Sequence, residues 1–328
     1  MGAVTEWLDA GAAANEPTAG TATADRPITT FAQIEEQVLS SGIKVRVALA
    51  GAHDTYSLEA LARAHDRGLV EAVLLGEQTR VEAALRELSA DPAAFEIVDC
   101  PDDDACARRA VEMVRAGEAD MPMKGLLQTS TYMHAILNKE NGLLPPGGLL
   151  SQSTLVEWLS EQRMFQITDC AINIAPTLEQ KKELIKNTVS LGHMLGWECP
   201  RVAVVSAVEK VNEKIPSTVD AVKLVEAARA GELGRCMVEG PLALDNAVSV
   251  EAAQHKGIAG EVAGRADILL MPDLCAGNIL TKSLTFFAHM RSAGCLLGTV
   301  KPVIATSRTD TPENKYCGIL VALLQAVS

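Results

Sequence analysis

The sequence predicts an α/β protein built from two doubly wound domains, each a largely parallel sheet covered by helices on both faces. Short apolar segments alternate with amphipathic ones along most of the 328 residues. A turn-rich break, NGLLPPGGLLSQS at 141–153, interrupts this alternation near the middle of the chain. More strand–helix units are present than one sheet accommodates, so we expect two domains with a ligand cleft between them.

Four strand–helix units precede the break. Apolar segments rich in aliphatic residues predict strands at 44–51, 71–76, 95–100 and 119–125. Segments with apolar residues three and four apart predict helices at 57–68, 78–89, 102–118 and 130–142. Strands that alternate with helices in this way form a parallel sheet, because each helix returns the chain to the edge where the next strand begins.

The units after the break follow the same rule. Strands are expected at 165–173, 201–210, 234–247, 266–273 and 301–308. Helices are expected at 177–196, 217–232, 249–257, 281–294 and 312–327. The last strand, buried over 302–305, and the last helix, which begins at Pro312, flank the polar turn TSRTDT.

The composition excludes several classes of function. The formal net charge is −13 and aromatic residues make up 3%, whereas nucleic-acid binding needs basic surface and stacking rings. No run of eighteen apolar residues is present, so we expect no membrane partner. The eight cysteines are scattered, without a C-x-x-C pair or a histidine at zinc spacing. This pattern predicts reduced thiols in a cytoplasmic protein and no metal site.

The N-terminal stretch MGAVTEWLDAGAAANEPTAGTATADRP differs in composition from the rest of the chain. It is rich in Ala, Gly and Thr, contains several acids and has almost no large apolar residues. It also lacks the basic region and the continuous apolar region of a signal peptide. Because it has so little apolar surface to bury, we expect residues 1–28 to form a disordered arm or linker.

Polar residues follow the predicted strand at 119–125, at the edge where the ligand crevice of an open α/β sheet lies. Gly125 permits close approach of the backbone to a ligand, and Thr129 with Ser130 stands where the next helix begins. Hydroxyls and free N–H groups at a helix N-terminus form an anion site. An ordinary N-cap is the alternative interpretation of these residues.

Three further turns after strands carry polar side chains. In chain order they hold Glu239, Asp245 and Asn246; Asp273, Gly277, Asn278 and Lys282; and Ser307 and Arg308, with Glu313 in the helix that follows. Four polar turns on parallel strands together predict a substrate that carries phosphate.

Several well-defined motifs are absent from the sequence. There is no G-x-G-x-x-G after a strand, no G-x-x-x-x-G-K-[ST], no G-x-S-x-G and no H-E-x-x-H. The sequence therefore offers no dinucleotide fingerprint, no P-loop, no nucleophile elbow and no zinc-protease helix.

Six ordered blocks of the sequence resemble the phosphate acetyl/butyryltransferase family. They are ADMPMKGLLQTSTYMHAIL, ITDCAINIAPTLEQKKELIKN, VAVVSAVEKVNEKIPSTVDA, VEGPLALDNAVS, ADILLMPDLCAGNILTKSLTF and PVIATSRTDTPENK. The similarity runs from about Phe31 to the C-terminus, and the stretches MKG and TDCAINIAPT are similar to the phosphate butyryltransferase branch. The chain is also similar to the C-terminal half of fusions of an enoyl-CoA hydratase with a phosphate acyltransferase.

The resemblance implies reversible transfer of an acyl group, acetyl or butyryl, between coenzyme A and inorganic phosphate. Coenzyme A is then a substrate, and no cofactor is implied. The fold implied is like that of isopropylmalate dehydrogenase, with the active site between two domains and a homodimer built mainly by the second. Since the last strand and helix return to the first domain in this family, we expect the domains at 29–150 with 300–328 and at 151–299.

The resemblance also assigns roles to individual residues. It makes Ser307 and Arg308 catalytic, with the planar donors of Arg308 suited to phosphoryl oxygens and Ser307 a donor to the oxyanion. Acetyltransferase members of the family commonly carry an Asp seven residues after this serine as general base, where this chain has Asn314, a change that butyryltransferase-type sequences tolerate. His134 stands where many relatives have Arg, so one positive charge is either missing or supplied by Lys124. The substrate-binding set is Lys124, Gly125, Thr129, Ser130, Asp273, Gly277, Asn278 and Lys282.

Two other interpretations start from the same fold. Isopropylmalate and isocitrate dehydrogenases share it, but their paired metal-binding aspartates and their nucleotide loop are not found in this sequence. The second alternative is a catalytically weakened acyl-CoA-binding protein, which Asn314 and His134 motivate.

Overall fold

The computed structural model describes residues 27–328. The predicted arm therefore lies outside the described residues up to position 26. The end of that prediction is wrong, because Ile28 is buried and its N–H donates to the carbonyl of Leu195 at 2.9 Å. Thr30 then caps helix α1, Phe31–Ser41, through a reciprocal capping box with Gln33.

The first sheet has four parallel strands in the order β3-β2-β1-β4. Its strands are β1 Val45–Ala50, β2 Val70–Gly76, β3 Glu96–Asp99 and β4 Met121–Lys124. The helices of these units are α2 Thr55–Asp66, α3 Gln78–Glu87, α4 Asp103–Ala116 and α5 Thr129–Ile136. The four strand–helix units predicted before the break are therefore confirmed.

Alternate residues of the central strand pack on opposite faces of this sheet. Val47 and Leu49 join the core that α1, α2 and α11 cover, whereas Ala48 and Ala50 join the core beneath α4 and α5. Burial on both faces explains why the strand is apolar without interruption from Val47 to Ala50. The order of the strands changes side between β1 and β4, because β2 and β3 lie on one side of β1 and β4 lies on the other. In such folds the carboxyl ends of the strands at this point form the crevice that receives ligands.

The second sheet is mixed, with six strands in the order β10-β5-β6-β9-β7-β8. The strands are β5 Ser151–Trp158, β6 Arg163–Thr168, β7 Arg201–Val205, β8 Met237–Leu242, β9 Ile268–Leu270 and β10 Ser292–Leu297. The helices are α6 Leu178–Met194, α7 Pro216–Arg229, α8 Leu244–Val248, α9 Val250–His255 and α10 Leu274–Phe286. Strand β5 is antiparallel to both β6 and β10, and the other pairs are parallel.

Several elements differ from the sequence prediction. Strands β5 and β10 and helices α1 and α8 were not predicted, and the helix expected at 281–294 is wrong. The strand expected at 301–308 is also wrong, because Val303 and Ile304 form only isolated bridges, to Leu296 and Met123. Helix α10 begins earlier, at Leu274, because Asp273 caps it by accepting from the N–H of Ala276 at 2.9 Å. Its predicted end instead leads into β10, which pairs with β5 along its whole length.

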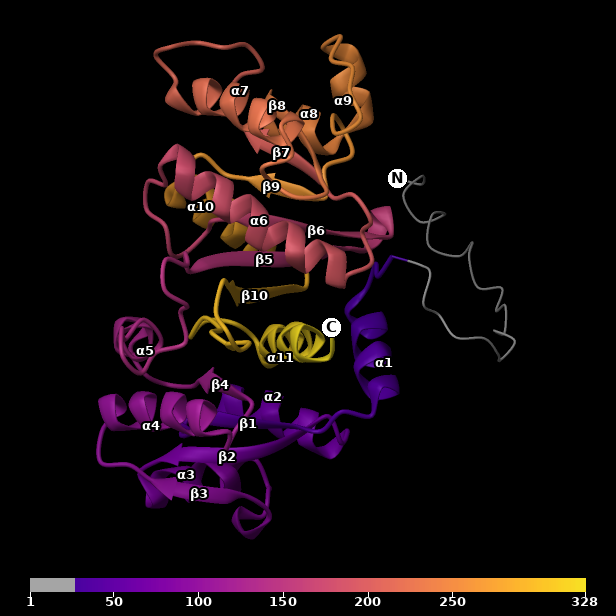
Figure 1. Cartoon of the computed structure of the whole chain (residues 1–328). Helices are drawn as coiled ribbons and strands as arrows, with labels where there is room; N and C mark the ends of the chain where they lie inside the picture. Colours follow the sequence, from indigo (N-terminus) through magenta and orange to yellow (C-terminus); the bar gives the residue numbers. More distant parts are fainter. Residues whose placement is uncertain (1–26) are drawn as a thin grey trace, which may run out of the picture.

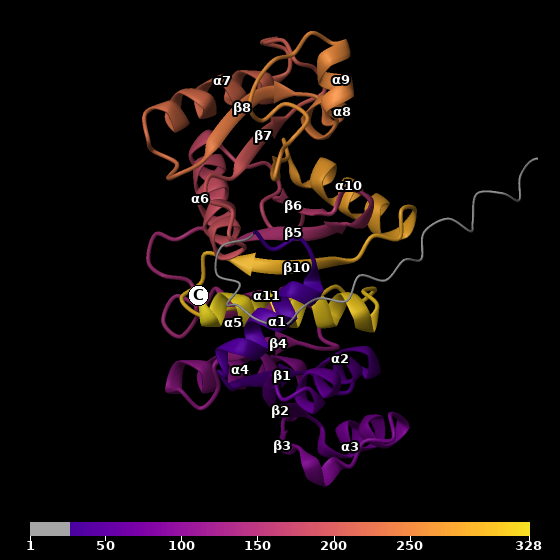
Figure 2. The same ribbon diagram turned by 90° about the vertical axis from the view of Figure 1, so that its right-hand side faces the viewer.

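Helix α11, Pro312–Val327, lies between the two sheets in both views of the molecule (Figures 1 and 2). The stretch before it returns to the first sheet, where Ile304 bridges Met123 of β4 in parallel. Ion pairs connect the halves around this helix. Glu313 of α11 binds Arg63 of α2 and Arg291, which in turn binds the fully buried Glu157 of β5.

The division into domains at 29–150 with 300–328 and at 151–299 stays a proposal. Two separate sheets support it, and so does the contact of α11 with α1 and α2. Among the described helices, none is both long enough and apolar enough to cross a membrane.

Candidate active site

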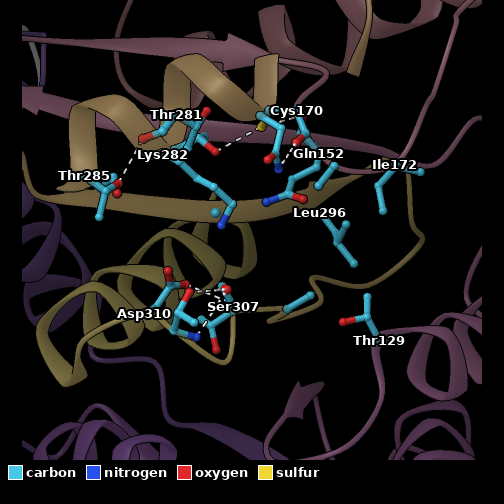
Figure 3. Close-up of a pocket in the computed structure, with 18 of the residues that line it drawn as sticks. Thr129, Gln152, Cys170, Ile172, Thr281, Lys282, Thr285, Leu296, Ser307 and Asp310 are labelled. Atoms are coloured by element: carbon cyan, nitrogen blue, oxygen red, sulfur yellow. Dashed lines mark hydrogen bonds between the residues drawn. The ribbon is translucent and has the colours of Figure 1, made fainter. Parts of the chain in front are cut away.

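A cavity of about 200 Å³ lies between the two sheets. It is lined by Lys124 and α5 from the first sheet's side, by β5, β10, α10 and the loop after β6 from the second, and by the turn before α11. Figure 3 shows the side chain of Lys282 pointing from α10 across this space towards Ser307 and Asp310. Five residues predicted from the sequence line the cavity: Lys124, Thr129, Asn278, Lys282 and Ser307.

Two lysines are almost completely buried at this end of the first sheet. Lys124, at the end of β4, is 2% exposed, and within residues 27–328 its Nζ donates only to the carbonyl of Gly125, at 3.3 Å. Lys315 of α11 is 1% exposed and lies directly behind the Ser307 turn. Burial, and then the charges of Lys315 and Arg308, lower the pKa of Lys124 to about 8. Two buried ammonium groups so close together favour the binding of an anion.

Lys315 has three polar contacts that Lys124 lacks. Its Nζ donates to the carbonyl of Ser307 at 3.0 Å and to Oγ1 of Thr306 at 3.3 Å. It also lies 3.5 Å from Oδ2 of Asp54. Burial lowers the pKa of Lys315, and the charges of Asp54 and Asp310 oppose this effect. Lys315 therefore holds the turn, whereas Lys124 is free to meet a ligand.

The turn from Ser307 to Asp310 is closed by its own side chains. The N–H of Ser307 donates to Oδ2 of Asp310 at 2.7 Å, and the N–H of Asp310 donates to the carbonyl of Ser307 at 3.2 Å. The hydroxyl of Ser307 lies 3.1 Å from that of Thr309. Ser307, Thr309 and Asp310 all line the cavity.

The wall opposite the lysines carries small uncharged side chains. Thr154 of β5, Cys170 after β6 and Gly294 of β10 line it. The thiol of Cys170 lies 3.1 Å from Oγ1 of Thr154, and burial raises its pKa to about 11. Cys170 is therefore protonated at neutral pH and is no nucleophile. This wall suits an uncharged group rather than a second anion.

A buried carboxylate shapes the loop that follows β6. Asp169 accepts hydrogen bonds from the N–H groups of Gln152, Ala171 and Ile172 and from the side chain of Asn173, at 2.7 to 3.1 Å. These bonds satisfy the carboxylate and fix the loop that places Cys170, Ala171 and Ile172 on the cavity. The sequence analysis missed this role of Asp169.

Helix α5 presents its first turn to the cavity. Thr129 and Ser130 are exposed and occupy its first two positions, and the residue before them makes no side-chain cap. Gly125 has a packing role instead, because a Cβ there would lie 2.4 Å from the carbonyl oxygen of Gly51. Gly125 thus lets β4 leave the sheet close to β1, where it positions Lys124.

Helix α10 contributes residues of two kinds. Lys282 and Asn278 line the cavity, and the amide of Asn278 also donates to the carbonyl of Cys170 at 3.1 Å. Asp273 is the N-cap, so its carboxylate is used within the helix. At Gly277 a Cβ would lie 2.3 Å from the carbonyl oxygen of Asp169, so this position has to be glycine for the helix to pack.

Several predicted residues lie at the rim of the cavity or away from it. Arg308 is exposed beside the cavity, between the lining residues Ser307 and Thr309. Asn314 is buried, and its side-chain oxygen accepts from the N–H of Ser292 at 3.2 Å. His134 lines a different hollow, between α4 and α5.

The predicted polar turn that holds Glu239, Asp245 and Asn246 does not reach the cavity. Glu239 accepts from the backbone N–H groups of Glu261 and Ala263, and Asp245 is paired with Lys256. These side chains stabilise loops of the second sheet. Only three of the four predicted turns therefore meet at one site.

Neither Lys315 nor Asp310 was predicted from the sequence as a site residue. Both lie in the stretch TDTPENK, and both read as ordinary charged residues around the start of a surface helix. The sequence feature that could have indicated the burial of Lys315 is the length of the apolar helix that contains it. Its central residues are buried almost throughout, which also buries a lysine four residues after its N-cap.

Comparisons with known proteins show to which sequences this chain is similar. Residues 104–323 match the family model described as Phosphate acetyl/butaryl transferase. The phosphate butyryltransferase of Clostridium acetobutylicum is 42% identical over 299 residues, which is 91% of this chain and 99% of that protein. The phosphate acetyltransferase of Thermotoga maritima is 40% identical over 288 residues, which is 88% of this chain and 97% of that protein.

A solved structure gives the same result for the fold. The crystal structure of a branched-chain phosphotransacylase from Enterococcus faecalis V583 superposes with a TM-score of 0.75 at 34% identity. The superposition covers 86% of this chain and 98% of the enterococcal one.

Proposed function

The chain belongs to the phosphate acetyl/butyryltransferase family, and from this premise we propose how its cavity works. The protein is a phosphate acyltransferase that moves an acyl group reversibly between coenzyme A and inorganic phosphate. Its substrates are acyl-CoA and phosphate in one direction, and acyl phosphate and coenzyme A in the other. Acetyl and butyryl are the acyl groups that its relatives act on by name.

One observation carries the proposal. The lysines at 124, 282 and 315 approach Asp310 from three different elements, and two of them are buried. Buried cations cost free energy unless an anion compensates them, so this part of the cavity is organised for a phosphoryl group. The part lined by Thr154, Cys170 and Gly294 is uncharged and suits the acyl chain. A site of this kind fits an acyl phosphate, which is anionic at one end and apolar at the other.

The turn before α11 completes the arrangement. The hydroxyl of Ser307 is exposed on the cavity and is able to donate to the oxygen of the carbonyl under attack. One such donor typically contributes about 3 kcal/mol to stabilising the tetrahedral intermediate. The first turn of α5, with Thr129 and Ser130, adds donors without net charge.

A single assay tests the function. We expect phosphate-dependent release of free coenzyme A, detected as a new thiol, from acetyl-CoA or butyryl-CoA. A series of longer and branched acyl groups then shows what the uncharged wall accepts. Failure of phosphate to release coenzyme A from any acyl-CoA, while the acyl-CoA still binds, would support the weakened acyl-CoA-binding protein instead.

We propose that Arg308 clamps the phosphoryl group from the rim of the cavity. Its guanidinium has no salt-bridge partner within residues 27–328, so it is available to a ligand. Arg308→Lys keeps the charge but loses the two parallel donors. We expect the KM for phosphate to rise about tenfold or more, since a charge-assisted hydrogen bond typically contributes about 1.5–3 kcal/mol. Unchanged phosphate kinetics in a folded Arg308→Lys variant would remove Arg308 from the site.

We also propose that two copies of the chain associate through α10. Cys275 and Ile279 are exposed one turn apart on one face of this helix. Phe286, at the edge of the cavity, is exposed as well, and Phe287 just after the helix is 86% exposed. An apolar stripe of this kind on a helix normally has a partner. Light scattering at micromolar concentration should give the mass of a dimer. The mass of a single chain would contradict the proposal.

Two further expectations belong with the proposed function. We propose a cytoplasmic location, which eight free cysteines favour, and cell fractionation would test it. We also propose that no bound cofactor is required, because lysines supply the positive charge that phosphate needs. Activity that is lost in the presence of a strong metal chelator would contradict this.

A further inference from the structure

The reaction requires a group that accepts the proton of the coenzyme A thiol. A thiol has a pKa of about 8.5, so it is mostly protonated at neutral pH and is a poor nucleophile in that form. Asn314 occupies the position at which acetyltransferase members of the family commonly have an aspartate, but an amide does not take up a proton. Its side-chain oxygen is in addition occupied by the N–H of Ser292, and Asn314 does not line the cavity.

The neighbouring carboxylate is also unsuitable. Glu313 is bound by two arginines, Arg63 and Arg291, and does not line the cavity. Its contacts tie α11 to the rest of the molecule, so it has no oxygen directed at a substrate.

Asp310 has the geometry that the other two lack. It is the one carboxylate among the residues that line the cavity. Oδ2 is fixed by the N–H of Ser307 at 2.7 Å, while no donor from residues 27–328 is bonded to Oδ1. Asp310 and Ser307 therefore present an acceptor and a donor side by side, three residues apart in one turn (Figure 3).

The charges around Asp310 come from three different elements. Burial raises the pKa of its carboxyl, and the Ser307 N–H and the ammonium groups of Lys315, Lys282 and Lys124 oppose this. These lysines belong to α11, α10 and β4, respectively. The same positive groups favour the thiolate and the departing phosphate, which are the anions formed when a proton is removed and the acyl group moves.

We propose that Asp310 is the general base of the acyl transfer, an inference that rests on the proposed function. Its carboxylate takes the proton from the thiol of coenzyme A, and the sulfur lone pair forms a C–S bond to the carbonyl carbon of the acyl phosphate. The carbonyl π electrons move to oxygen and then return as the C–O bond to phosphate breaks. Phosphate leaves with that electron pair. In the reverse direction, protonated Asp310 returns its proton to the departing thiolate.

Asp310→Asn is the decisive variant. The asparagine oxygen still accepts from the N–H of Ser307, so the turn is kept, but the proton acceptor is lost. We expect kcat for coenzyme A attack on acyl phosphate to fall by about 10²–10⁴-fold, with little change in KM for either substrate. The rate of the variant should then rise about tenfold per pH unit from pH 6.5 to about 8, because thiolate has to come from solution. The rate of the parent should vary little over this range.

Glu313→Gln is the matched control, since it removes a carboxylate three residues away that does not face the cavity. It should keep the pH profile of the parent. An Asp310→Asn variant that unfolds at the same temperature as the parent, yet retains more than a tenth of kcat with a flat pH profile, would overturn the assignment. The parent alone provides a second test, because a tenfold rise in its own rate per pH unit would also overturn it. A parent without phosphate-dependent activity would instead overturn the proposed function.

Discussion

Replacing Lys124 by methionine is expected to make the protein more resistant to urea and, at the same time, to lower kcat/KM for phosphate by about two to three orders of magnitude. Loss of one partner of a buried, hydrogen-bonded charge pair typically costs about 2–5 kcal/mol of binding. The ammonium of Lys124 is buried, and within residues 27–328 one backbone carbonyl accepts a hydrogen bond from it. We therefore expect its charge to bind the anionic ligand and to lower the stability of the folded protein when no ligand is bound.

The direction of the stability effect follows from the pKa of Lys124. It is about 8 in the folded protein, against an ordinary value of 10.5. Between these values the unfolded chain binds more protons, so this group makes stability rise with pH across that window. At pH 7, below both values, the cost of burying the charge is present in full and amounts to about 3 kcal/mol. Methionine avoids this cost, and its advantage should shrink from pH 8 to 10.5.

The measurement is the urea midpoint of Lys124→Met and of the parent in phosphate-free buffer at pH 7. Lys301→Met, at an exposed lysine, is the control and should leave both the midpoint and the phosphate kinetics unchanged. Phosphate should raise the midpoint of the parent more than that of Lys124→Met, because a ligand stabilises the state that binds it. A variant that is less stable than the parent at pH 7 would show that the ammonium is compensated within the fold.

The strand–helix units of the first sheet were predictable because their signals are local. Strand β1 is apolar from Val47 to Ala50, and its neighbour β2 is apolar from Ala72 to Leu75. The convergence of polar turns was predictable for the same reason, since the carboxyl ends of parallel strands share one edge of a sheet. Thr129, Asn278, Lys282 and Ser307 line one cavity, as this rule leads us to expect, and their roles stay a prediction.

The elements that the sequence analysis missed depend on distant partners. Strand β5 begins with Ser151, Gln152, Ser153 and Thr154, a polar run that becomes a buried strand only because β6 and β10 pair with it on both sides. Strand β10 contains Gly294, which weakens any strand signal. In both cases long-range hydrogen bonding outweighed local propensity.

The charged residues of the site were missed for a related reason. A lysine on a helix usually extends into solvent, so the burial of Lys315 follows from packing between the sheets and not from its own sequence. Asn314 was assigned by its distance from Ser307 along the chain. Asp310 is a carboxylate on the cavity in the structure, because the turn folds back on itself before the helix begins.

Lys315→Met is expected to have the opposite effect on stability from Lys124→Met. Lys315 is equally buried, but its ammonium is the partner of Asp54, Thr306 and the carbonyl of Ser307. Removing one member of a buried pair typically costs about 3–5 kcal/mol, because the remaining groups lose their partner without regaining water. This loss outweighs the gain from no longer burying the ammonium. The urea midpoint should therefore fall, and kcat/KM should fall with it as the Ser307 turn loosens.

A double variant separates the buried charge from the loosened turn. In Lys315→Met the carboxylate of Asp54 keeps its hydrogen bonds from Ser57, at 2.5 and 3.2 Å, but has lost the ammonium that compensates its charge. Adding Asp54→Asn removes that charge and still leaves an oxygen for Ser57. The double variant should therefore recover part of the lost stability, a coupling that two independent sites would not show. It should not recover kcat/KM, because the carbonyl of Ser307 still lacks its donor. If Lys315→Met is as stable as the parent, or if the double variant regains activity together with stability, then Lys315 does not hold the turn, and its charge serves the phosphate in the same way as that of Lys124.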